Sequence, residues 1–225
     1  MFKNLLDIFT APMAVFPRLL EKPTVLVPLL ILLVAIASIQ VGYLTTSDRN
    51  FLIDQLVDQA MSTRDTIRES EIRPMYENLN PAVLIGSAVV STIIILSLLM
   101  LITAMYLNFI SKFGHETRTY KQWLSLVCWT SMPSLLIVLA AWVTMATGGG
   151  QVSMTALQPL SLDFLLGLDS GKQILQQLSL PAFWSMGLLV LGYQHFTGSR
   201  LTRAAVITLL PYVLLYGLWA YFSFR

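Results

Sequence analysis

Long apolar segments alternating with short polar ones dominate the sequence. A membrane-spanning helix takes about 20 mostly apolar residues. Five stretches approach that length without any Asp, Glu, Lys or Arg: residues 24–44, 82–108, 123–147, 181–197 and 204–224. The fourth is the shortest, but the uncharged run from Gly187 to Leu191 at its centre favours a span. The pattern predicts an all-α, polytopic membrane bundle with five transmembrane helices.

The first span has an alternative interpretation as a secretory signal. Basic residues precede it, and Ala35-Ile36-Ala37 within it fits the small-x-small pattern of signal cleavage. The apolar run continues past that point to Leu44, which favours a retained anchor.

Residues 1–22 show a different pattern from the spans. Apolar residues recur at helical spacing from Phe2 to Phe9, ahead of Pro12 and Pro17. This amphipathic spacing predicts a short helix lying at the membrane interface.

The distribution of Lys and Arg predicts the orientation, because positive charge favours the cytoplasmic side. One side would carry eight basic residues: Lys3, Arg18, Lys22, Lys112, Arg118, Lys121, Arg200 and Arg203. The opposite side would carry six: Arg49, Arg64, Arg68, Arg73, Lys172 and Arg225. The expected topology therefore has the N-terminus inside and the C-terminus outside, in a single domain over residues 1–225 with helical loops outside at 45–81 and 148–180.

The first outside loop contains a candidate acidic ridge. Four carboxylates, Asp54, Asp58, Asp65 and Glu69, fall on one side of a helical wheel, opposite an apolar face that includes Ile53 and Val57. Pro74 is expected to end this helix. The pattern favours a helix lying on the membrane surface or on the bundle, with divalent cation binding or a basic partner as alternatives.

The second outside loop opens with Gly148-Gly149-Gly150 and is otherwise apolar. Short helices at the interface or folded against the spans are the simpler expectation. A re-entrant element lining a cavity is the alternative, since broken backbone is tolerated at membrane depth only where protein or water satisfies it.

Composition narrows the functional classes. The chain is 56% hydrophobic and only 12% charged, with a formal net charge of +2, so the bilayer is the expected solvent and no nucleic-acid partner is predicted. Spans without acidic or basic residues disfavour ion-coupled transport. No metalloprotease, nucleophile-elbow or phosphate-loop motif occurs, and neither the two histidines nor Cys128 has ligand-type spacing. We therefore expect no catalytic residue, metal or cofactor.

Three groups of residues resemble the Yip1-domain family, in particular its compact bacterial branch. They are Phe9-Thr10-Ala11-Pro12 with Phe16 and Pro23; Gly114 and Tyr120-Lys121-Gln122 before a span with Ser131 and Pro133; and Phe183-Trp184 with Leu191-Gly192. The resemblance runs from about Leu5 to Phe222. It implies a five-helix integral membrane protein with a cytoplasmic N-terminus, here in a bacterial inner membrane. Eukaryotic relatives are associated with Rab GTPases and vesicle traffic.

These observations lead to two functional hypotheses. The first is a non-enzymatic scaffold that organises membrane or binds lipids, a membrane-protein partner or a second copy. Its candidate contacts are Lys112, Gly114, His115, Arg118, Tyr120, Lys121, Phe183 and Trp184. The second is a transporter, channel or lipid-moving protein with a cavity between spans two and four and the loop from Gly148 to Gly171.

Overall fold

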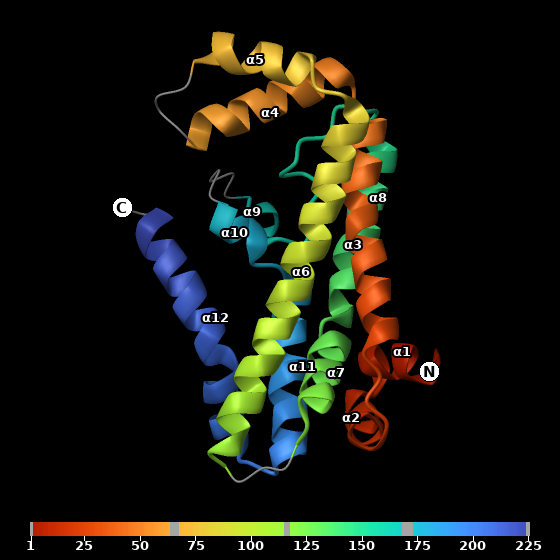
Figure 1. Cartoon of the computed structure of the whole chain (residues 1–225), viewed down its shortest axis with the longest axis vertical. Helices are drawn as coiled ribbons and strands as arrows, with labels where there is room; N and C mark the ends of the chain where they lie inside the picture. The colour runs from red at the N-terminus through yellow and green to blue at the C-terminus, as the bar shows by residue number, and fades with distance from the viewer. Residues whose placement is uncertain (1, 64–67, 115–117, 168–172, 224–225) are drawn as a thin grey trace.

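The computed structural model describes residues 2–63, 68–114, 118–167 and 173–223. These residues form α-helices and connecting turns, with one isolated bridge between Ser161 and Ser179 as their only β-type pairing. Figure 1 shows the long helices lying roughly side by side, with short helices packed at both ends of the bundle. The predicted all-α fold is confirmed.

Four helical segments are long and apolar enough to cross a membrane. They are Leu26–Thr46 (α3), Pro81–Lys112 (α6), Tyr120–Thr147, and Leu201–Phe222 within α12 (Leu201–Ser223). The predicted fourth span corresponds to α11 (Leu180–Thr197), which is not among these four. The count supported by length and hydropathy in the described residues is therefore four, one fewer than expected.

The third span is broken rather than continuous. It consists of α7 (Tyr120–Thr130), a 3₁₀ turn η1 (Met132–Ser134) and α8 (Leu135–Thr147). Pro133 lies in the turn, and proline cannot donate the backbone hydrogen bond that a continuous α-helix requires. At the other end, Thr119 and Gln122 form a reciprocal capping box that fixes where α7 begins.

Local signals also set the ends of α11. The Ser179 hydroxyl accepts from the Ala182 backbone N–H, and Pro181 occupies the first turn, where its missing N–H costs nothing. Gly198 ends the helix with a φ of 64°, a left-handed conformation that glycine adopts freely. The helix then reverses into α12, and the two helices lie side by side (Figure 1).

The N-terminal segment forms two helices, α1 (Phe2–Thr10) and α2 (Pro12–Glu21), where a single short helix was expected. Arg18 of α2 forms an ion pair with Asp7 of α1. The apolar side of the pair packs against α7 and α11, so that Ile8, Phe16 and Leu19 are fully buried. Protein therefore covers this face, which the sequence analysis assigned to the membrane interface.

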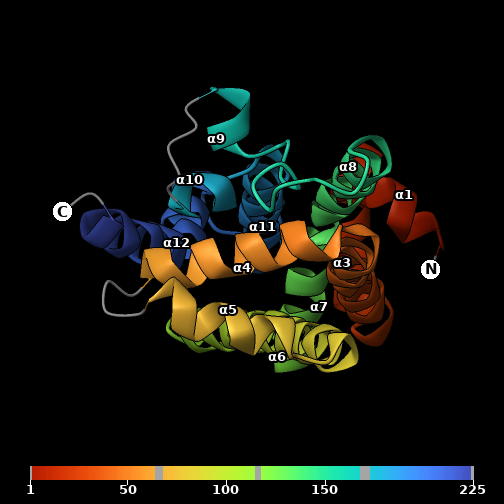
Figure 2. The same cartoon turned by 90° about the horizontal axis from the view of Figure 1, so that it is seen from above.

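At the opposite end of the bundle, the described residues between α3 and α6 form a helical hairpin. It comprises α4 (Arg49–Thr63) and α5 (Glu69–Glu77), which lie side by side across the end of the bundle (Figure 2). The expectation that Pro74 ends a helix is wrong, since α5 continues through Pro74 to Glu77. Pro74 lacks the N–H that would donate to the Ser70 carbonyl, and α5 continues past it without that hydrogen bond.

The loop that begins at Gly148 folds against the same end of the bundle. Two short helices, α9 (Leu162–Leu165) and α10 (Gln173–Gln177), agree with the simpler expectation. Val152 and Leu157 are buried in a cluster with Tyr43 of α3. The Asp48 backbone N–H donates to the Gly150 carbonyl at 2.9 Å, which joins the ends of α3 and α8.

Candidate intramembrane site

The described residues form a half-open cavity on one side of the bundle. It has a volume of about 500 Å³ and lies between α3, α6, the broken α7–η1 segment and α12. Apolar side chains such as Leu32, Leu96 and Met100 form most of its wall. Its volume falls in the range of about 300–1,000 Å³ that is typical of small-molecule pockets.

The position of α12 keeps the cavity open. Figure 1 shows α12 leaning away from α6 toward its C-terminal end. Pro211 within α12 cannot donate to the Ile207 carbonyl one turn earlier. The Tyr106 hydroxyl of α6 donates to that carbonyl instead, at 2.9 Å. The two helices are thus joined below the cavity and diverge above it.

The break in the third span also lines the cavity. Ser131 and Ser134 flank Pro133, and both contribute to the cavity wall. The Ser131 hydroxyl donates to the Val127 carbonyl at 2.8 Å, in addition to the backbone N–H of Ser131. Irregular backbone at membrane depth occurs where protein or a cavity covers it, and this arrangement meets that condition.

Hydroxyl groups supply the polar chemistry of the cavity. Six of its lining residues carry one: Thr103, Tyr106, Ser131, Ser134, Tyr212 and Tyr216. No Asp, Glu, Lys, Arg or His is among the described residues that line it. Thr103, Tyr106 and Ser131 donate to backbone carbonyls. Within the described part of the chain, the side-chain hydroxyls of Ser134, Tyr212 and Tyr216 form no hydrogen bond.

A second apolar groove of about 420 Å³ lies on the other side of α12, between α11 and α12. Tyr212 and Tyr216 line both spaces, so α12 separates them. Neither space matches the expected cavity, which was to lie between spans two and four and the loop from Gly148 to Gly171. The main cavity includes the second span without α11, and the groove includes α11 without residues 148–171.

One face of α7 closes the bundle beside α2 and α3 through a polar ladder that sequence analysis missed. The Gln122 side chain donates to the Leu20 carbonyl at 2.7 Å. The Ser125 hydroxyl and the Trp129 indole N–H donate to the Thr24 carbonyl at 3.0 and 3.1 Å. Polar residues at positions 122, 125 and 129 share one helical face, and that spacing was the available signal.

The candidate contact residues separate into two places. Arg118 donates to the Phe196 carbonyl at the end of α11, at 3.0 Å, and the Tyr120 hydroxyl donates to Leu101 of α6 at 3.3 Å. Phe183 and Trp184 lie in the first turns of α11, about 20 Å away along the helix at 1.5 Å per residue.

The remaining candidate contacts divide between exposed and undescribed positions. Lys112 and Lys121 are exposed, and Gly114 follows the end of α6. His115 lies outside the described residues. Partner contact at the candidate positions therefore stays a prediction. Arg118 and Tyr120 have a structural role as well, because their hydrogen bonds reach α11 and α6.

The acidic ridge is divided between the two helices of the hairpin. Arg73 of α5 forms ion pairs with Asp54 of α4 at 2.8 Å and Glu69 at 2.9 Å. These hydrogen bonds, the one to Asp54 first, raise the pKa of the Arg73 guanidinium. Asp58 is exposed on α4, and Asp65 lies outside the described residues. Two of the four carboxylates thus pair with a side chain of the same hairpin.

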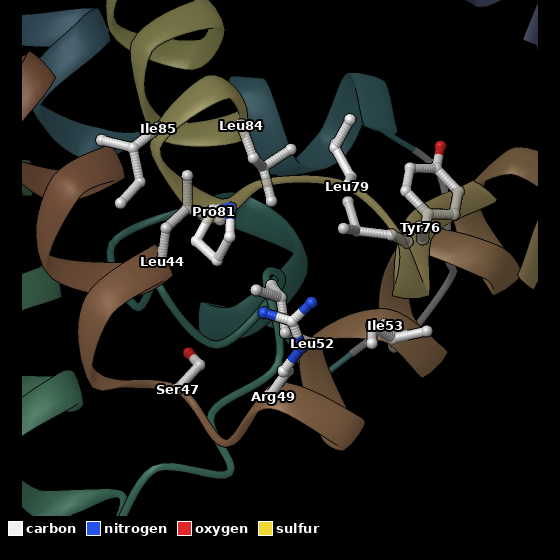
Figure 3. A pocket seen from close by; sticks show the side chains of 11 residues that line it. Leu44, Ser47, Arg49, Leu52, Ile53, Tyr76, Leu79, Pro81, Leu84 and Ile85 are labelled. Atoms are coloured by element: carbon white, nitrogen blue, oxygen red, sulfur yellow. The ribbon is translucent and has the colours of Figure 1, made fainter. Parts of the chain in front are cut away.

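A smaller pocket of about 100 Å³ lies beneath the hairpin. In Figure 3, Pro81, Leu84 and Ile85 of α6 face Arg49 and Leu52 of α4 across this pocket. Arg49 donates to the Glu77 backbone carbonyl at 2.9 Å. The pocket is only about a fifth the size of the intramembrane cavity, and its one guanidinium already binds the end of α5.

The His, Cys, Asp and Glu side chains of the described residues are the candidates for metal binding or catalysis. None of them forms a group of three or more His, Cys, Asp and Glu side chains that could hold a metal ion. Cys128 is fully buried within α7. His195 lies against the Phe16 ring, with ring centroids 6.1 Å apart.

The helices and the cavity together define a multi-pass, α-helical integral membrane protein. Residues 6–222 match the family model described as Yip1 domain. The chain belongs to the Yip1-domain family, as the resemblance in its sequence predicted. Neither a curated protein nor a solved structure matches it significantly.

Proposed function

We propose that this protein is a non-enzymatic membrane scaffold that binds a lipid within its transmembrane bundle, in the inner membrane of a bacterium. The observation that carries the proposal is the cavity of about 500 Å³ between α3, α6, η1 and α12. Resemblance to the compact bacterial branch of the family supports the location.

The surroundings of the cavity favour a lipid over a water-borne solute. Exposed apolar side chains stand at its rim on α6 and α12: Leu99, Ile102 and Leu215. Only 6% of the most apolar 18-residue stretch of each of these two helices is buried. A mouth between two such helices opens toward acyl chains.

The proposed topology has five crossings, with α11 as the fourth. The Asp48–Gly150 hydrogen bond places the ends of α3 and α8 together, and the Arg118–Phe196 hydrogen bond places the start of α7 beside the end of α11. The chain therefore returns along the bundle through α11. We propose that the N-terminus is inside and the C-terminus outside. Reporter fusions after Asn78, Arg118 and Arg225 test this, and a cytoplasmic C-terminus would contradict it.

Filling the cavity tests the proposed function directly. Ser134→Leu adds an apolar side chain at the cavity wall. The matched control is Ser91→Leu, at an exposed position on α6. Each full-length protein is purified in mild detergent and examined by native mass spectrometry. We expect lipid to remain bound to the wild type and to Ser91→Leu, and to be lost from Ser134→Leu.

Thermal unfolding and size-exclusion chromatography establish that both variants are folded. Equal lipid on all three proteins, or none on the wild type, would contradict the proposal. Lipid loss confined to the folded Ser134→Leu protein is the outcome that supports it.

A lipid-moving or transport activity is the second candidate function. The break at Met132–Ser134 favours it, because discontinuous spanning helices commonly form substrate sites in transporters. Vesicles reconstituted with the protein would show flux of lipid between leaflets, or of a small solute. If lipid stays bound in the cavity and no flux is measured, the transport candidate is excluded and the scaffold proposal remains.

A further inference from the structure

We infer that the ligand of the intramembrane cavity is an uncharged lipid whose polar part carries carbonyl oxygens, such as a diacylglycerol ester or a quinone ring. This inference rests on the proposed lipid-binding function. It concerns which lipid chemistry the cavity selects.

The absence of charge from the wall excludes a charged headgroup inside the cavity. A phosphate or carboxylate taken from water into an apolar space needs a paired cation or several strong donors. No Lys, Arg or His lies among the described lining residues. A phospholipid headgroup there would lose its hydration without gaining a partner.

The hydroxyl groups are matched to a neutral acceptor. The side-chain hydroxyls of Tyr212, Tyr216 and Ser134 form no hydrogen bond within the described residues, although the other lining hydroxyls donate to backbone carbonyls. A tyrosine hydroxyl is a neutral donor with an ordinary pKa near 10. Polar groups at membrane depth without partners are costly, so a carbonyl oxygen on the ligand would satisfy donors that the protein leaves open.

The two tyrosines are also well placed along the path of entry. They lie one turn apart on α12, which forms one side of the cavity mouth, with Leu215 between them at the rim. Ser134 lies on the far wall, at the break in the third span. A lipid entering between α6 and α12 passes the tyrosines before it reaches the serine.

A pair of lipids with the same chains tests the inference. Dioctanoylglycerol and dioctanoyl phosphatidic acid carry the same acyl chains and the same esters, and differ in the charged phosphate. Their binding to the full-length protein in detergent is measured by native mass spectrometry, with a short-chain quinone as a third ligand. We expect at least one neutral lipid to bind about tenfold or more tightly than the charged one.

Removing single hydroxyls locates the interaction. Tyr212→Phe and Tyr216→Phe keep the ring and remove the donor, and each is expected to weaken neutral-lipid binding about 2- to 10-fold, as the net value of one hydrogen bond implies. Tyr76→Phe, in the pocket beneath the α4–α5 hairpin, is the matched control and should leave binding unchanged.

The outcomes separate this inference from the function on which it rests. Two outcomes would overturn the choice of ligand and keep the lipid-binding function, provided that Ser134→Leu abolishes binding. One is tighter binding of the charged lipid, and the other is binding that neither tyrosine variant changes. No binding of any of the three lipids would overturn both. Preference for the glycerolipid or for the quinone identifies the source of the carbonyl group.

Discussion

Two regions of the bundle differ in how completely protein covers them. Where α1, α2, α7 and α11 meet, Phe16, Trp123, Trp129 and Phe196 are fully buried. We call this region the closed end. On the open side, formed by α6 and α12, only 6% of each helix's most apolar stretch is buried, against 50% for the third span.

The difference shows two ways in which apolar helices are used in this bundle. Lipid tails are as apolar as leucine, so packing and hydrogen bonds stabilise a membrane bundle more than burial does. The closed end has both, with the polar ladder of α7 and the stacked Trp123 and Tyr193 rings, whose centroids are 5.4 Å apart. On the open side, α6 and α12 pack on other helices but hardly on each other, and the described hydrogen bond between them is that of Tyr106 to the Ile207 carbonyl.

The largest expected effect comes from breaking the closed end at Trp129. Trp129→Ala leaves a cavity and removes the indole donor to Thr24. We expect a loss of about 3 kcal/mol in stability, near the low end for such core truncations because the membrane lacks much of the transfer term. Thermal unfolding in detergent measures it. Trp184→Ala, at a partly exposed tryptophan of α11, should cost much less, and equal losses would contradict the contrast.

Two glycines of α11 give a finer comparison. A Cβ atom at Gly192 would lie 2.4 Å from Leu126 Cδ1 and 3.2 Å from Phe16 Cε1, whereas one at Gly187 would meet no atom within 4 Å. Gly192→Ala is therefore expected to destabilise the bundle by about 1–3 kcal/mol through overpacking. Gly187→Ala should be neutral or slightly stabilising, because alanine favours helix more than glycine does. The same unfolding assay compares them, and a reversed order would show that α7 and α11 do not pack this closely.

On the open side, the hydrogen bond between Tyr106 and the Ile207 carbonyl is the contact to remove. Tyr106→Phe leaves that carbonyl without a donor, since Pro211 has none to offer. We expect a loss of about 1 kcal/mol and a greater spread between probes on α6 and α12 in distance measurements. Tyr76→Phe again serves as the control, because its ring lies in the pocket beneath the hairpin. An unchanged distance distribution would show that this bond does not hold the two helices together.

Much of the fold was accessible from the sequence, because long uncharged segments have few alternatives to membrane helices. The break at Pro133 and the depth of α1 and α2 were not predicted. The depth of α1 and α2 depends on which neighbours cover them, as at Phe16 against His195, and periodicity carries no such information. The break has a local cause in Pro133, a residue visible in the sequence within the predicted third span. The cavity depends on the divergence of α12 from α6. Pro211 was visible in the sequence, but the partner of the Ile207 carbonyl was not.

The smallest expected effect lies at the hairpin, outside the contrast between closed end and open side. Arg73→Gln removes ion pairs with Asp54 and Glu69 that are open to solvent, and such exposed pairs contribute little to stability. We therefore expect unchanged thermal unfolding of the bundle, with faster amide hydrogen exchange confined to α4 and α5. This difference between the variant and the wild type should shrink as salt is added, because salt screens the ion pairs of the wild type. Lys121→Gln, at an exposed lysine of α7, controls for the loss of one positive charge. The described ion pairs of Arg73 reach only α4 and α5. Altered lipid binding in Arg73→Gln would therefore show that the hairpin and the cavity are coupled.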